Sequence, residues 1–156
     1  DKSTQRIAGT AVFLTPRTDL TPGPMLHSIK HYRLLHERVV LVSVIVEDVP
    51  VVEPARHVEV EKLGKGFFAV KLHYGFFEYP DVPKSLELAR PYGLVIDPDS
   101  TTFFVGREML VPASRPVLSP WRIALYTWLA SNAYSPARFF RLPANRVVEL
   151  GTQISI

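Results

Sequence analysis

The feature that most constrains this fold is the uncharged run of residues 39–46, VVLVSVIV, which is almost entirely valine, isoleucine and leucine. A continuous apolar run of this length, closed by two acids and a proline, is typical of a strand buried on both faces of a sheet. We therefore predict a central strand within residues 38–50. Its ends carry His36-Glu37-Arg38 and Glu47-Asp48, which are the first places to look for a ligand or a partner.

Two further patterns extend this sheet. Residues 9–15 form a short apolar strand, and the prolines of residues 21–24 open a helix, so that strand, helix and buried strand make a parallel βαβ unit. Residues 57–74 alternate polar and apolar side chains around Gly64-Lys65-Gly66, which predicts an antiparallel hairpin. Its expected register places Glu59 opposite Lys71, Val60 opposite Val70 and Leu63 opposite Phe67.

The remaining residues predict more helices and two more strands. Helices are expected from Asp81 to about residue 92, over 121–133 and from residue 135, and strands at 101–105 and 146–156. The predicted fold class is α/β, with α+β as the alternative: a mixed sheet with one parallel βαβ unit, an antiparallel hairpin and about four helices. Residues 1–8 are expected to be a linker and 9–156 a single domain.

Composition limits what such a chain can do. It has 156 residues, of which 47% are hydrophobic and 21% charged, as in one globular domain. It contains no cysteine, which excludes disulfides, thiolate catalysis and cysteine metal sites. The longest uncharged run, 123–137, is too short to span a bilayer, and the chain does not begin with Met, so we expect a soluble piece of a longer polypeptide.

Charge is unevenly spread along the chain, although the net charge is only +3. Residues 47–62 are acidic overall, whereas residues 107–146 contain one acid and six arginines: Arg107, Arg115, Arg122, Arg138, Arg141 and Arg146. The arginine-rich part is expected to attract phosphates, an anionic lipid surface or an acidic partner. The alternative is ordinary solvated surface charge.

Three arginines lie at the ends of predicted strands, namely Arg38, Arg107 and Arg146. Ligands of open α/β sheets collect at strand ends, so these side chains form a candidate site for a phosphate-bearing effector. The alternative is that they make structural ion pairs with Glu37, Glu108 or Glu149.

Other motifs have simpler explanations. His27 and His31 have the i, i+4 spacing of two metal ligands, but basic residues flank them and no HExxH pattern is present. Asp97 and Asp99 flank a proline and precede Ser-Thr-Thr, as in an Asx turn. No nucleophile with a base, Walker loop or Rossmann glycine motif is found. We therefore expect no catalytic residue, no metal and no cofactor, and we expect that the chain is not an enzyme.

Two aromatic clusters are either core or surfaces for self-association. One consists of Trp121, Leu125, Trp128 and Leu129, and the other of Phe76, Phe77 and Tyr79. The core is the usual place for such residues, but a small domain does not always cover two clusters of this size.

Several short segments carry a resemblance to a known family. They are GTAVFL at 9–14, LH at 26–27, LHERVV at 35–40, YGF at 74–76 with PDVP at 80–83, FVGRE at 104–108, and FFRLP at 139–143 continuing to NRVVELG at 145–151. In this order they resemble the C-terminal cytoplasmic portion of the Kup family of bacterial potassium uptake permeases. The resemblance extends over residues 9–156.

This resemblance implies a parent protein that imports potassium by symport with protons through membrane helices that precede residues 1–8. It implies a non-catalytic cytoplasmic domain that regulates or assembles the transporter at the cytoplasmic face of the bacterial inner membrane. The alternative is a sensor domain for a nucleotide or another anionic effector. Its expected partners are the transmembrane part of the same polypeptide, a second copy in a homodimer and the nearby anionic membrane surface, and no nucleic acid is expected.

Overall fold

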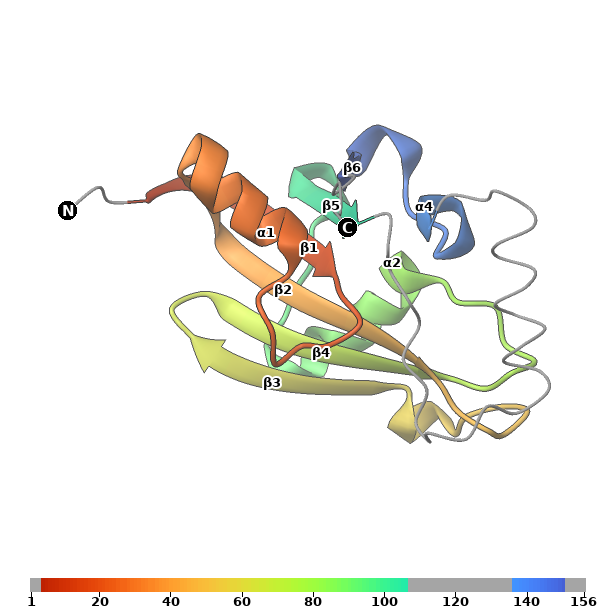
Figure 1. The fold of residues 1–156 in the computed structure, drawn as a ribbon. Coiled ribbons are helices and arrows are strands. Elements are labelled where there is room, and N and C mark those ends of the chain that lie inside the picture. The colour runs from red at the N-terminus through yellow and green to blue at the C-terminus, as the bar shows by residue number, and fades with distance from the viewer. Residues whose placement is uncertain (1–3, 107–135, 151–156) are drawn as a thin grey trace.

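A six-stranded sheet forms the centre of the structure, a computed structural model that describes residues 4–106 and 136–150 (Figure 1). The strands are β1 (Gln5–Leu14), β2 (Leu34–Val46), β3 (Val58–Gly64), β4 (Phe67–Tyr74), β5 (Thr101–Gly106) and β6 (Val147–Leu150). Their order across the sheet is β3-β4-β2-β1-β5-β6. All neighbouring pairs are parallel except β3 and β4, so the sheet is mixed and the α/β class is confirmed.

The apolar run of residues 39–46 lies in β2, between β4 and β1, as predicted. Val39, Val40, Val42 and Val44 have no solvent exposure. The strand begins at Leu34, four residues before the predicted start, because β1 also begins early, at Gln5, and pairs with this extension. Residues 5–8, which the sequence assigned to a linker, are thus part of the sheet in the described chain.

The predicted βαβ unit is confirmed. Between the parallel strands β1 and β2 lie α1 (Gly23–His27) and η1 (Ser28–Tyr32), which continues α1 as a π-helical turn. The helix begins directly after Pro22, with Pro24 in its first turn, where a missing N–H costs nothing. Met25 and Ile29 pack against one face of the sheet.

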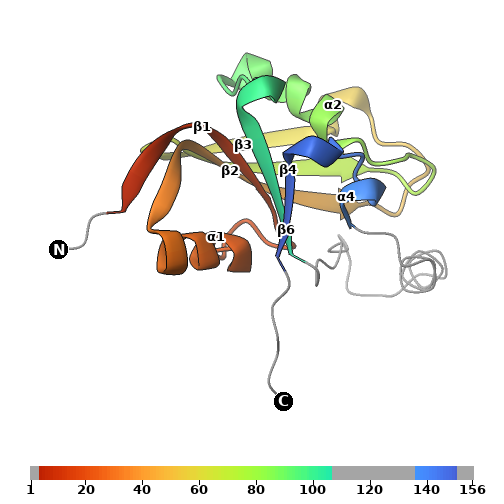
Figure 2. The ribbon, with the colours of Figure 1, turned by 90° about the horizontal axis from the view of Figure 1, so that it is seen from above.

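A second crossover covers the opposite face. It joins β4 to β5 through α2 (Val82–Leu86) and η3 (Glu87–Tyr92), in the region predicted to be helical. The Asp81 side chain caps α2 by accepting a hydrogen bond from the Lys84 N–H (3.2 Å), and Gly93, with φ +84°, ends η3. Figure 2 shows α1 on one side of the sheet and α2 on the other, as two crossovers running in opposite directions require.

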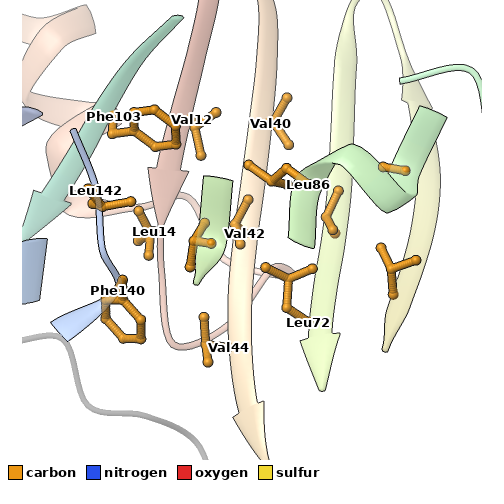
Figure 3. Close-up of a cluster of buried hydrophobic side chains, with 14 of the residues drawn as sticks. Val12, Leu14, Val40, Val42, Val44, Leu72, Leu86, Phe103, Phe140 and Leu142 are labelled. Atoms are coloured by element: carbon orange, nitrogen blue, oxygen red, sulfur yellow. The ribbon is translucent and has the colours of Figure 1, made fainter. Parts of the chain in front are cut away.

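The larger part of the core lies on the α2 side of the sheet. Figure 3 shows side chains of β1, β2, β4 and β5 meeting Leu86 of α2 and, from the segment after α4 (Pro136–Phe139), Phe140 and Leu142. The α1 side holds a smaller cluster around Phe13, which stacks on Phe104 with ring centroids 4.7 Å apart. Among residues 4–106 and 136–150, the α2 face therefore carries the larger share of the buried side chains.

The hairpin has the predicted pairing except at its turn. Glu59 pairs with Lys71 and Val60 with Val70, but Phe67 pairs with Gly64 and not with Leu63. The predicted three-residue loop was wrong because Lys65 and Gly66 alone form the turn, both with positive φ, as type I′ hairpin turns require. Leu63 is left as a bulge next to this tight turn.

The remaining predictions have mixed outcomes. The described residues contain three α-helices, α1, α2 and α4, and not about four. The helix predicted at 121–133, with its cluster of Trp121, Leu125, Trp128 and Leu129, lies outside the described residues. The strand predicted at 101–105 is β5, and the described part of the last strand is β6, at 147–150.

The turn of the hairpin generates a stability prediction. A Cβ atom on Gly66 would lie 2.2 Å from the Glu37 carbonyl oxygen, whereas a Cβ on Gly64 would meet nothing within 4 Å. Both glycines have positive φ, so alanine at either position strains the backbone, at a cost of about 1 kcal/mol. Gly64→Ala has only this strain and is therefore the matched control. We expect Gly66→Ala to lower the free energy of unfolding by about 1–3 kcal/mol more than Gly64→Ala does in urea titrations. Equal losses would contradict the close packing of this turn on β2.

Candidate functional site

Two of the three arginines of the predicted effector site lie level with the starts of β5 and β6. Arg38 pairs with Thr10, which pairs with Thr101, so Arg38 lies level with the start of β5. Arg146 immediately precedes β6, which begins opposite Phe103 of β5. The separation of β2 and β6 by two strands puts these arginines roughly 14 Å apart at the backbone.

Both guanidinium groups bind the backbone of the same loop. Arg38 Nη1 donates a hydrogen bond to the Val95 carbonyl oxygen (2.5 Å), and Arg146 Nη2 donates to the Asp99 carbonyl oxygen. Arg107 follows Gly106, at the opposite end of β5, and lies outside the described residues. The structure thus brings Arg38, from within β2, and Arg146, just before β6, to the loop that precedes β5.

The Asp97 and Asp99 pair forms a turn in this loop. Asp97 Oδ1 accepts a hydrogen bond from the Asp99 N–H (3.1 Å), and its Oδ2 accepts one from the Ser100 hydroxyl (3.0 Å). The Asp97 carbonyl oxygen accepts another from the Thr101 hydroxyl (2.5 Å). These bonds confirm the Asx-turn interpretation, because the carboxylate caps its own backbone.

The histidines of the first helix lie beside each other. The rings of His27 and His31 have centroids 4.4 Å apart, and within the described residues no group of three or more histidine and acidic side chains is arranged to hold a metal ion. His36, at the start of β2, lies against the edge of Phe104, and burial lowers the pKa of its ring. A lowered pKa keeps this imidazole neutral near pH 7.

Just after β2, Glu47 is the centre of a partly buried polar cluster. Its Oε1 lies 3.0 Å from His73 Nδ1 and 3.5 Å from Arg56 Nη2, and the far nitrogen of His73 lies 3.4 Å from Glu59 Oε1. The side chains of Glu47 and His73 are only 13% and 12% exposed. Burial at this level requires that the carboxylate have partners, and the histidine and arginine supply them.

A second carboxylate, Glu78, fastens the neighbouring loops. Its Oε2 accepts hydrogen bonds from the N–H groups of Gly75 (2.6 Å) and Val52 (3.0 Å), and its Oε1 lies 3.2 Å from His57 Nε2. Gly75 also lies so close to Pro50 that an added Cβ would be 2.2 Å from its carbonyl oxygen. The Glu78 side chain therefore fastens the segments that follow β2 and β4, which backbone hydrogen bonds from Phe76 to Val49 and from Phe77 to Pro50 also join.

The sequence pattern pointed to Glu47 but not to His57, His73 or Glu78. The signal for the histidines was present, because a register that pairs Glu59 with Lys71 also places His57 near His73. The His73 N–H indeed donates to the His57 carbonyl oxygen (2.8 Å). Glu78 has no such signal, since its partners come from loops whose paths no sequence pattern predicts.

Tyr74, the last residue of β4, connects this end of the sheet to α2. Its hydroxyl donates to the Asp81 carbonyl oxygen (3.2 Å) and lies 2.6 Å from the Ser85 hydroxyl. Only 5% of Tyr74 is exposed, and burial raises the pKa of its phenol to about 12. The folded protein thus disfavours the phenolate.

This pKa predicts an alkaline loss of stability. The ordinary tyrosine pKa is about 10, so above that pH the unfolded chain releases a proton that the folded chain keeps until about pH 12. The free energy of unfolding should therefore fall by about 2–3 kcal/mol across this window. In denaturant titrations at successive alkaline pH values, Tyr74→Phe should flatten the decline.

Tyr79→Phe is the matched control for this experiment, because Tyr79 is 80% exposed. We expect it to keep the alkaline decline of the unmodified chain. A decline of the same size in Tyr74→Phe would show that other groups cause it.

The sequence of this chain matches a known protein family. Residues 8–156 match a family described as "K+ potassium transporter C-terminal domain". The "Probable potassium transport system protein Kup 1" of Paramagnetospirillum magneticum is 47% identical over 151 residues, and the "Probable potassium transport system protein Kup" of Pseudomonas aeruginosa (strain LESB58) is 49% identical over 151 residues. Each alignment covers 97% of this chain and 24% of the relative.

A third relative, the "Probable potassium transport system protein Kup" of Zymomonas mobilis, is 44% identical over 154 residues, covering 99% of this chain and 24% of the relative. No solved structure matches this chain. None of the helices in residues 4–106 and 136–150 is long and apolar enough to cross a bilayer. The match over nearly the whole chain shows that it belongs to the Kup family of potassium transporters, as the C-terminal domain.

Proposed function

We propose that this chain is a non-catalytic domain that regulates or assembles a potassium uptake transporter at the cytoplasmic face of the bacterial inner membrane. The observation that carries the proposal is the extent of the match: the domain family covers residues 8–156, while the chain spans about a quarter of the length of its relatives. The movement of potassium, in symport with protons, then belongs to the membrane part of the same polypeptide.

The contacts of the polar side chains support a role without turnover. The carboxylates of Glu47 and Glu78 contact histidine, arginine and backbone N–H groups. Arg38 and Arg146 donate hydrogen bonds to carbonyl oxygens. Such contacts fix loops at both ends of the sheet. A rigid scaffold with positioned loops is suited to docking against other parts of a protein.

An exposed aromatic loop surface supports assembly into a homodimer. Phe77 and Tyr79 are 73% and 80% exposed, and Val51 beside them is 62% exposed. The Phe77 N–H donates to the Pro50 carbonyl oxygen (3.0 Å), which holds the two loops side by side. Aromatic side chains on a fixed backbone lose little entropy on binding, so a second copy of the chain is the partner that we assign to this surface.

The test uses the full-length transporter in bacteria that lack other potassium uptake. We expect removal of this domain to change the rate or the regulation of potassium uptake, or the oligomeric state of the purified protein. Phe77→Ser with Tyr79→Ser serves as a milder variant that should lower dimer formation in light scattering, while Tyr92→Ser, at a 49% exposed residue on η3, is the control. Unchanged uptake and unchanged assembly in both the deletion and the double variant would refute the proposal.

A second candidate function is sensing of an anionic effector at Arg38 and Arg146. The specific observation in its favour is that two guanidinium groups converge on one short loop, residues 95–99, from β2 and from the start of β6. A guanidinium has five N–H donors, and each of these carbonyl contacts uses a single one. An anion held by both arginines would bridge β2 and the start of β6. Arg107, which follows Gly106 at the opposite end of β5, is not included in this candidate site.

Thermal-shift measurements with nucleotides and cyclic dinucleotides test this candidate. A ligand at 100 times its dissociation constant should stabilise the chain by about 2.7 kcal/mol. We expect the shift to disappear in Arg38→Ala with Arg146→Ala and to persist in Arg90→Ala, which removes an exposed arginine from η3. The absence of any shift in the unmodified chain, or its persistence in the double variant, would eliminate this candidate.

A further inference from the structure

The outer side of α1 and η1 combines exposed apolar and basic side chains. Leu26 is 53% exposed and Tyr32 is 63% exposed, although Met25 and Ile29 on the same helix face the sheet. Lys30 and Arg33 are also exposed, and residues 20–36 contain no acidic residue. We call this surface, formed by Leu26, Lys30, Tyr32 and Arg33, the basic helix face.

Two more cations extend the basic helix face across the adjoining strand ends. Arg6 of β1 lies over the Phe67 ring, 5.1 Å from its centroid, and its Nη1 donates to the His36 carbonyl oxygen (2.8 Å). Its Nη2 donates to the carbonyl oxygen of Lys65, an exposed residue in the hairpin turn (3.4 Å). Exposed acids also lie on this side of the sheet, namely Glu37 in β2 and Glu59 and Glu61 in β3, so the stretch without any acid is that of α1 and η1.

The aromatic side chains of this face are held by neighbours. The His27 ring lies 4.4 Å from the His31 ring and 5.9 Å from the Tyr32 ring, centroid to centroid. Tyrosine combines an apolar ring with a polar hydroxyl, the combination that is enriched where membranes meet water. A helix with basic and apolar exposed residues is the usual form of a segment that lies on a bilayer surface.

We propose that the basic helix face rests on the anionic surface of a lipid bilayer. Lysine and arginine side chains within a Debye length of such a surface are attracted to it, and Leu26 and Tyr32 would enter the headgroup region. The inference rests on the proposed function, in which membrane helices precede this domain. It is consistent with the path of the chain, because the Gln5 N–H donates to the Arg33 carbonyl oxygen (2.8 Å), so the chain enters the sheet beside this face.

The opposite side of the sheet provides a matched comparison. The helical segment of α2 and η3 also exposes two apolar residues, Leu88 and Tyr92, which are 45% and 49% exposed, and two cations, Lys84 and Arg90. It differs in charge balance, because Glu87 lies among them. Figure 2 shows that these two helical segments face away from each other, so a flat bilayer cannot contact both at once.

Because the chain has no cysteine, single labels can report which side touches lipid. The experiment attaches an environment-sensitive fluorophore to Leu26→Cys or to Leu88→Cys of the 156-residue chain and adds vesicles. Vesicles of equimolar phosphatidylcholine and phosphatidylglycerol should shift the emission of the label at residue 26 to the blue. Vesicles of phosphatidylcholine alone should not, and the label at residue 88 should respond to neither.

Charge variants test the same contact without a label. Each cation near an anionic surface contributes about a fivefold change in partitioning, so Lys30→Gln with Arg33→Gln should weaken binding to the anionic vesicles roughly 25-fold. Lys84→Gln with Arg90→Gln removes the same charge from the opposite side and should leave binding near its original level. Raised salt should also weaken binding of the unmodified chain.

Several results would overturn the inference. They are no binding of the unmodified chain to the anionic vesicles, equal losses in the two charge variants, or a blue shift at residue 88 and not at residue 26. Binding that survives Lys30→Gln with Arg33→Gln would assign the lipid contact to other residues. None of these results bears on whether removal of the domain alters potassium uptake, so failure here is distinct from failure of the proposed function.

Discussion

The burial of β2 on both faces is the constraint on which the rest of the structure depends. Val40, Val42 and Val44 pack in the core on the face of the sheet that α2 covers. Val39 and Leu41 pack on the face that α1 covers. Each such side chain contributes about 1.5–3 kcal/mol when it leaves water, so both faces have to be covered. Right-handed crossovers that start in opposite directions place one helical segment on each face, which explains the positions of α1 and α2.

The apolar run 39–46 of β2 is flanked by charged residues, Arg38 within the strand and Glu47 just after it, and the protein uses those charges to fasten loops. Arg38 holds the loop at Val95, and Glu47 binds His73 and Arg56 at the other end. The exposed surfaces therefore project from fixed positions. The aromatic loops lie beyond one end of β2 and β4, whereas the basic helix face lies on one side of the sheet, so a second copy and a bilayer would not compete for the same residues.

The sequence predicted those parts of the fold that depend on local pattern. The strand over 39–46, the helix opened by the prolines of residues 21–24, the helix that starts at Asp81 and the pairing of Glu59 with Lys71 all follow from short-range rules, and the structure confirms each. The first residues of β1 and β2 were not predicted to be strand because they include polar residues such as Arg6 and His36. Only the pairing of β1 with β2 across the sheet makes them strand residues. Glu78 was missed because its partners belong to loops, where tertiary contacts and not periodicity decide the geometry.

The position of β1 determines how this domain would respond to a mechanical pull. Residues 10–14 of β1 pair with β2 on one side and with β5 on the other, and both pairings are parallel. Tension applied through the residues before Gln5 would act along the axis of β1. The hydrogen bonds that join β1 to β2 and to β5 would then be loaded in shear, so they would have to break together rather than one at a time. A displacement transmitted through this end would therefore move the whole sheet as a unit instead of peeling a strand from it.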